Sequence, residues 1–191
     1  MNSKKKGTFG YINSYKKFRL IISLILAAMI SFTIITMLIM VGTTKSVLVI
    51  VPILLTLPFA KFLVGYIMVI KFKPIDKDVY EKINDKINLD TTNLLFDVVI
   101  TEAEGMKFFQ TMCVKNNHIY AYVEDSNFKS ERKNYEKWIR NCACDSKYDY
   151  KIIVVDNIDE FIKKVNQAST PNDTTRLIDK HITERILVTC V

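Results

Sequence analysis

The chain has 191 residues and a formal net charge of +7, but its apolar residues and its excess charge are both concentrated in the first 70 residues. Those residues carry eight basic side chains and no Asp or Glu, whereas residues 71–191 carry 19 basic and 20 acidic side chains. A nucleic-acid-binding domain concentrates positive charge on its folded part, so this distribution argues against a nucleic-acid partner and is typical of a membrane protein.

The first segment, residues 1–19, is a basic arm with aromatic residues interleaved among its basic ones. Aromatic rings favour the headgroup level of a bilayer, and each lysine near an anionic surface contributes roughly 1 kcal/mol. We therefore expect the arm to lie on the cytoplasmic membrane surface. The residues expected to contact anionic lipid are Lys4, Lys5, Lys6, Lys16 and Lys17.

Two apolar runs follow, at 20–41 and 47–70, separated by only five residues. The first run would span about 33 Å as a helix, enough to cross a hydrocarbon core of about 30 Å. A signal peptide also begins with a basic region, but its apolar core is only about 7–15 residues long. The sequence therefore predicts an uncleaved transmembrane hairpin at residues 20–70.

The two predicted membrane helices differ in regularity. In the first, Ser23, Ala27 and Ser31 recur every four residues and form a stripe of small side chains. Such a stripe lets another helix approach closely, either the second helix or a second copy of the chain. The second helix contains Pro52 and Pro58, and each removes a backbone hydrogen bond and favours a kink.

Lys61 lies inside the second apolar run, and a charge within a membrane is a candidate functional residue by default. The structural alternative, which we favour, is contact with lipid phosphate or headgroup water, or a shallow end to the second helix. Neither apolar run contains an acidic residue that could pair with Lys61.

The orientation of the hairpin follows from the distribution of basic residues around it. Six lie in the arm, one lies between the runs, and Lys71, Lys73 and Lys77 follow the second run. The positive-inside rule then predicts a multi-pass cell-membrane protein with both termini in the cytoplasm. Residues 71–191 would form a cytoplasmic domain whose cysteines are reduced.

Hydrophobic periodicity in residues 71–191 predicts an α/β domain. The Asn116-Asn117 pair suits a tight hairpin turn, and Asp156 or Asn157 suits a helix N-cap. The expected order is αβββαβααβ, a mixed sheet with helices packed on it. The predicted elements are helix 76–88, strands 94–101, 106–115 and 118–124, helix 130–142, strand 150–155, a helix from residue 158, helix 174–183 and strand 185–191.

Residues 96–112 resemble the nuclease-related domain pattern of restriction-endonuclease-like folds, with Asp97 on a strand, a glycine turn and a second strand. The resemblance implies a Mg²⁺-dependent nuclease whose second strand carries Glu-x-Lys. This chain has Gln110 in place of the carboxylate and Met112 in place of the lysine, although a shifted register supplies Lys115. Asp97, Gln110 and Lys115 are therefore the candidate residues, and the ligand set lacks the carboxylates that Mg²⁺ prefers.

The remaining residues predict no catalytic group, cofactor or metal site. The Cys142-x-Cys144 spacing lacks the two-residue gap of structural zinc pairs. Cys142 is expected in the core, and Cys144 as a surface thiol. Cys113 and Cys190 also read as core residues.

The Leu57–Lys61 stretch, between an apolar hairpin and a short α/β domain, is similar to small uncharacterised two-span membrane proteins of clostridia, among the low-GC Gram-positive bacteria. This resemblance implies placement and no particular activity. The first hypothesis is a membrane-anchored interaction module that binds a protein partner or forms a homo-oligomer. The alternatives are a membrane-tethered, degenerate nuclease-like enzyme and an accessory subunit of a larger membrane complex.

Overall fold

The computed structural model describes residues 4–41, 50–87, 92–102, 105–143 and 150–190. The described chain forms two compact units, one made of residues 12–73 and the other of residues 4–11 together with 74–191. The predicted loop between the apolar runs lies outside the described residues.

The first unit consists of two long apolar helices, α1 (Tyr11–Val41) and α2 (Ile50–Ile70). Both are long and apolar enough to cross a membrane, and only 11% and 6% of their most apolar windows are buried. A core helix of a soluble protein would bury most of that surface. The α1 helix begins nine residues before the apolar run, because the end of the basic arm is also helical.

The α2 helix runs without interruption through both prolines. Pro52 lies in the first turn, where a backbone N–H has no partner within the helix. Pro58 lies in the interior, where it removes one hydrogen bond, a loss that membrane helices tolerate.

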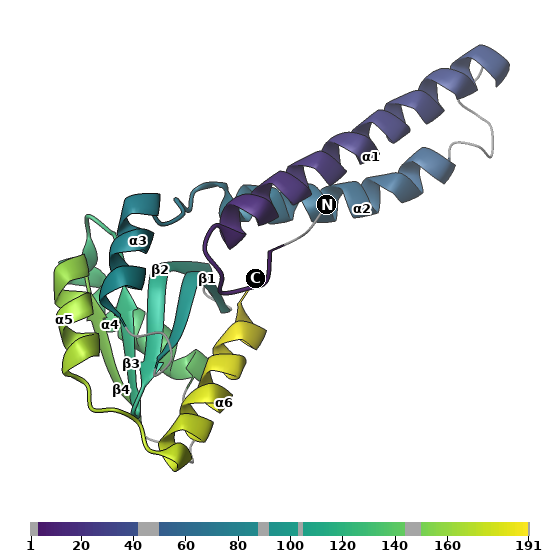
Figure 1. The fold of residues 1–191 in the computed structure, drawn as a ribbon. Helices are drawn as coiled ribbons and strands as arrows, with labels where there is room; N and C mark the ends of the chain where they lie inside the picture. The colour runs from purple at the N-terminus through teal and green to yellow at the C-terminus, as the bar shows by residue number, and fades with distance from the viewer. Residues whose placement is uncertain (1–3, 42–49, 88–91, 103–104, 144–149, 191) are drawn as a thin grey trace. The chain divides into compact units, whose positions relative to one another are not determined.

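The second unit is built on a four-stranded sheet in the order β1-β2-β3-β4 (Figure 1). Its strands are β1 (Asn93–Glu102), β2 (Gly105–Lys115), β3 (His118–Tyr122) and β4 (Lys151–Val155). The first two pairings are antiparallel and the third is parallel, so the prediction of a mixed sheet is confirmed. Asn116 and Asn117 have φ values of 48° and 60°, which confirms the predicted tight turn between β2 and β3.

Helices cover both faces of this sheet (Figure 1). On one face, α3 (Lys77–Lys86) and α5 (Ile158–Gln167) pack through residues such as Ile83 and Phe161. On the other, α4 (Phe128–Ala143) and α6 (Asp173–Thr189) pack through residues such as Trp138 and Ile182. Asn157 is the N-cap of α5, and its side chain accepts hydrogen bonds from two backbone N–H groups.

The predicted terminal strand at 185–191 is wrong, because α6 continues to Thr189. Its β-branched residues favour a strand locally. However, Ile178, Ile182, Ile186 and Cys190 recur every four residues and pack on the α4 side of the sheet. This helical period was present in the sequence and spans the predicted boundary at residue 183. A single bridge between Ile100 and Cys190 is the only β pairing in the described part of this segment.

Residues 4–11 pack on the α/β unit, and their expected contact with a membrane surface stays a prediction. The carbonyl of Gly7 accepts a 2.9 Å hydrogen bond from the backbone N–H of Phe96 in β1. The ring of Phe9 stacks on Tyr80 with 4.2 Å between centroids. The arm lies here because β1 is an edge strand, whose outward N–H groups need partners.

Candidate functional site

Asp97, the acidic residue of the nuclease-like pattern, lies where the alternation of side chains between the two faces of β1 is interrupted. Its φ is 52°, and its side chain is buried. Phe96 packs toward α3 and α5, but Val98 packs toward α4 and α6. Residues two apart on a regular strand share a face, so the strand reverses its faces at Asp97. The carboxylate Oδ1 accepts a 3.2 Å hydrogen bond from the backbone N–H of Ile75, which joins the start of the domain to its sheet.

Gln110 lies opposite Asp97 in the β1–β2 register, between the pairs Phe96–Thr111 and Val98–Phe109. Phe109 and Met112 share the α4 side although they are three residues apart, so β2 also reverses its faces here. The buried Gln110 Oε1 accepts a 2.9 Å hydrogen bond from the backbone N–H of Glu124, where the chain has left β3. The side-chain oxygen of Gln110 thus accepts the bond that a backbone carbonyl of a neighbouring strand would accept within a regular sheet.

Lys115 is separated from these two residues. It lies five positions beyond Gln110, about 17 Å along the strand. Its buried Nζ donates a 3.0 Å hydrogen bond to the carbonyl of Val165 in the last turn of α5, where a positive charge is favoured by the helix dipole. The three candidate residues do not form one site, and each contacts a backbone group.

Asp179 on α6 is a buried charged residue that sequence reasoning missed. Its carboxylate accepts hydrogen bonds from the backbone N–H groups of Asn116, at 2.7 Å, and Asn117, at 3.2 Å. The Tyr150 hydroxyl donates a third bond, at 3.3 Å. The only sequence signal was its place on the buried face of α6, one residue from Ile178. The arrangement fixes the β2–β3 turn against α6.

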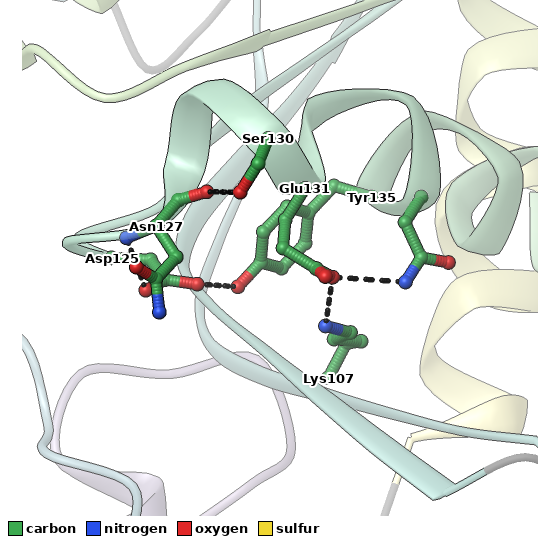
Figure 2. A network of polar contacts seen from close by, with 7 residues as sticks. Lys107, Asp125, Asn127, Ser130, Glu131 and Tyr135 are labelled. Carbon is green, nitrogen blue, oxygen red and sulfur yellow. Dashed lines mark hydrogen bonds and ion pairs between the residues drawn. The ribbon is translucent and has the colours of Figure 1, made fainter.

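The second polar cluster joins β2 to the beginning of α4, as Figure 2 shows. Lys107 Nζ donates a 2.8 Å hydrogen bond to Glu131 and also lies over the ring of Tyr135. The Tyr135 hydroxyl donates a 2.6 Å bond to Asp125 Oδ2, while the backbone N–H of Asn127 donates to Oδ1. These residues come from β2, a loop and α4, so no local pattern in the sequence groups them.

Electrostatics make this cluster a structural network rather than an acid–base pair. Burial, followed by the bond to Asp125, raises the pKa of Tyr135, so the phenol keeps its proton. The same bond lowers the pKa of Asp125, and the bond from Lys107 lowers the pKa of Glu131. Both carboxylates therefore remain ionised and serve as hydrogen-bond acceptors.

The cysteines of the domain are buried thiols. Burial raises the pKa of Cys113 and of Cys190 to about 12 in each case, which makes both poor nucleophiles. Cys142 is also buried, as expected, and Cys144 lies outside the described residues. Across the described part of the chain, no three His, Cys, Asp or Glu side chains gather as metal ligands would.

Described residues of the α/β unit line at least two hollows. One, of about 320 Å³, is lined partly by His118, Tyr120 and Lys164, and the His118 Nδ1 lies 2.8 Å from the carbonyl oxygen of Asn116. The other, of about 460 Å³, lies beside α6 and is lined by Asn93, Asp173, Arg176, Leu177 and Lys180. Leu177 is 71% exposed, so the second hollow combines an apolar side chain with two basic ones and one acidic one.

The predicted packing stripe of α1 is only partly covered. Ser23 is buried, Ala27 is partly exposed and Ser31 is exposed. The Ser23 hydroxyl donates a 2.8 Å bond to the carbonyl of Leu20, and that of Ser31 donates a 3.0 Å bond to Ala27. Both hydroxyls thus bond to their own helix, as is common for serine in membrane helices.

Basic side chains join the two long helices at the end where α1 begins. Lys16 donates to the carbonyls of Ile70 and Phe72, where α2 ends. Arg19 lies three residues after Lys16 on α1 and donates a 3.4 Å hydrogen bond to the backbone carbonyl of Lys61 in α2. The Lys61 side chain itself is exposed.

No protein-family model matches the chain, and no curated protein or solved structure matches it significantly. The resemblances to nuclease-related domains and to two-span clostridial proteins stay predictions.

Proposed function

We propose that this chain is a membrane-anchored interaction module. In this proposal α1 and α2 cross the cell membrane, both termini lie in the cytoplasm, and the α/β domain binds a protein partner or a second copy there. The observation that carries the proposal is the exposed apolar surface of the helices, with Phe32 73%, Leu57 70% and Ile39 79% exposed. Apolar surface on this scale is stable in lipid and unstable in water.

The distribution of charge supports the cytoplasmic placement of the domain. The first acidic residue of the chain is Asp76, and the basic residues cluster before α1 and after α2. Positive charge at both of these ends favours their retention on the cytoplasmic side. The buried thiols of the domain also suit a reducing compartment.

The surface beside α6 is our candidate contact surface for the partner. Leu177 is an exposed apolar residue at the edge of a hollow, with Arg176 and Lys180 around it. An apolar side chain ringed by charged ones is a common arrangement at protein interfaces. A protein partner with an acidic rim would complement it.

The experiment that tests the proposal is affinity capture after chemical cross-linking in cells. The full chain is compared with a form in which residues 12–73 are replaced by a Gly/Ser linker, so that residues 4–11 still reach the domain. We expect both forms to capture the same partner. Capture only by the full chain would assign association to the helices and favour the accessory-subunit alternative.

A pair of surface variants tests the contact surface. Leu177→Glu should reduce recovery of the partner, because a carboxylate replaces an exposed apolar contact. Thr174→Glu introduces the same charge at another exposed position of α6 and should leave recovery unchanged. Equal recovery with both variants would place the interface elsewhere on the domain.

A further inference from the structure

Arg19 is a half-buried cation whose described contacts are all with neutral groups. Its guanidinium donates to the Tyr15 hydroxyl and to the Lys61 carbonyl. It also lies over two aromatic rings, 4.8 Å from the centroid of Tyr15 and 5.3 Å from that of Phe62. These contacts orient the guanidinium between the two helices, and none of them, within the described residues, supplies a counter-ion.

The chain cannot supply that counter-ion from its membrane-proximal part. No Asp or Glu occurs before Asp76, and Arg19 directly precedes the apolar run that begins at Leu20. A second copy of the helices has the same composition and brings no carboxylate either. A charge at the edge of hydrocarbon is costly unless an anion compensates it.

Lys61 lies at the same level of the helix pair, since its own carbonyl accepts the bond from Arg19. Its side chain is exposed. Arg19 lies where the first apolar run begins, and Lys61 lies at the same level although it is within the second run. Two cations at one level of neighbouring helices, beside the start of an apolar run, suit the phosphate of a lipid at a bilayer surface. We propose that Arg19 and Lys61 form a binding site for the phosphate of one anionic lipid headgroup. The inference rests on the proposed function only in placing the helices in a membrane.

Gly65 shapes this site. A methyl group on Gly65 would lie 2.6 Å from Arg19 Nη1 and 2.9 Å from Cζ. Both are closer than atoms without a bond between them can approach, so a larger residue would push the guanidinium away from α2. Gly65→Ala is therefore a substitution that moves the charge of Arg19 without removing it.

The test is native mass spectrometry of the purified full chain in detergent, with phosphatidylglycerol or phosphatidylcholine added. We expect the wild type to retain phosphatidylglycerol at least roughly fivefold better than phosphatidylcholine. Arg19→Gln and Gly65→Ala should each lose most of this preference. Lys73→Gln removes a charge from an exposed position beyond the end of α2 and should retain this preference.

Other outcomes would overturn the proposal. Equal losses in Lys73→Gln and Arg19→Gln would show diffuse attraction to a charged surface. An unchanged preference in Gly65→Ala would show that the position of the guanidinium is irrelevant. Displacement of the lipid by millimolar inorganic phosphate would indicate a site for free phosphate. An acidic protein bound in place of lipid would also contradict the proposal.

Carbonate extraction of the same variants from membranes separates these results from failure of the anchoring proposal. A variant that stays in the membrane but has no headgroup preference contradicts the lipid site alone.

Discussion

Asp179 shows at the residue scale how a buried charge is used for structure. Its carboxylate holds two backbone N–H groups of the Asn116-Asn117 turn and the Tyr150 hydroxyl. Asp179→Ala leaves these buried donors without an acceptor and should destabilise the domain by about 3 kcal/mol. Asp179→Asn retains one acceptor oxygen and should destabilise the domain less than Asp179→Ala does.

Urea unfolding of the full chain in detergent measures this difference. Trp138 reports on the domain alone, because it is the single tryptophan of the chain and is buried against the sheet. Glu184→Ala, at an exposed position of the same helix, serves as the control and should change stability little. A loss for Asp179→Ala no larger than that of the control would contradict the turn-capping role.

The bond between Tyr135 and Asp125 predicts a pH dependence. It lowers the folded-state pKa of Asp125 below its ordinary value of 3.8, so its stabilisation is present above that value and is lost as the pH falls through the lower folded pKa. Tyr135→Phe removes the largest cause of this shift. At pH 7 the variant should be less stable by on the order of 1 kcal/mol, because the site is partly exposed.

Denaturation at pH 7 and pH 2 tests this prediction. The stability gap between wild type and Tyr135→Phe should narrow at pH 2, because that pH lies below the ordinary pKa of 3.8 and the stabilisation is lost as Asp125 takes up its proton. Lys133→Gln, on the exposed face of α4, should leave the acid dependence as it is in the wild type. A gap of the same size at both pH values would show that the hydroxyl acts through packing and not through the carboxylate.

At the scale of elements, the segment 4–11 closes the outer edge of β1. Gly7 has φ +76°, and a methyl group there would lie 2.8 Å from side-chain atoms of Leu95 and Leu187. Gly7→Ala should weaken docking of the segment by about 1–2 kcal/mol, because a left-handed alanine is strained and both leucines must move. Hydrogen exchange of the Phe96 amide should become roughly tenfold faster.

The Phe96 amide is the correct reporter because it donates to the Gly7 carbonyl. Lys5→Ala, at an exposed position of the same segment, should leave its exchange unchanged. Identical exchange in Gly7→Ala and wild type would mean that the segment does not protect the edge of β1 in solution.

Most elements could be predicted from period and turn chemistry. The two apolar helices, the Asn116-Asn117 turn and the Asn157 cap depend on local sequence alone. The change of faces in β1 at Asp97 could not be predicted from the sequence. Phe96 and Val98 are both apolar, so the hydrophobic pattern does not indicate that they face opposite sides of the sheet. The strand predicted at 185–191 was wrong for another reason. The β-branched residues of this segment favour a strand locally, whereas the four-residue period of its apolar residues, which decides the structure, favours a helix.

For the candidate site, the sequence indicates the chemical type of each residue but not its contact partners. The sequence singled out Asp97, Gln110 and Lys115 for their chemical type, but their backbone partners come from segments 14 to 50 residues away in the chain. Such pairings need the folded topology. Arg19, which was counted only as one of several basic residues, acquires its place from α2.

At the scale of the whole molecule, the account depends on the side of the membrane that the α/β domain occupies. Two helices long enough to span a membrane, with basic residues before the first and after the second, place the domain and both termini on the cytoplasmic side in our proposal. Because Cys113, Cys142 and Cys190 are buried, the folded domain should give little background reaction with thiol reagents.

The most direct test is therefore labelling with a membrane-impermeant maleimide in intact cells, in a Cys144→Ser background. One variant carries Lys129→Cys on the exposed surface of α4, and the other carries Thr44→Cys between the two apolar runs. We predict labelling of Thr44→Cys in intact cells, and labelling of Lys129→Cys only after the membrane is permeabilised. Labelling of Lys129→Cys in intact cells would contradict the cytoplasmic placement of the domain.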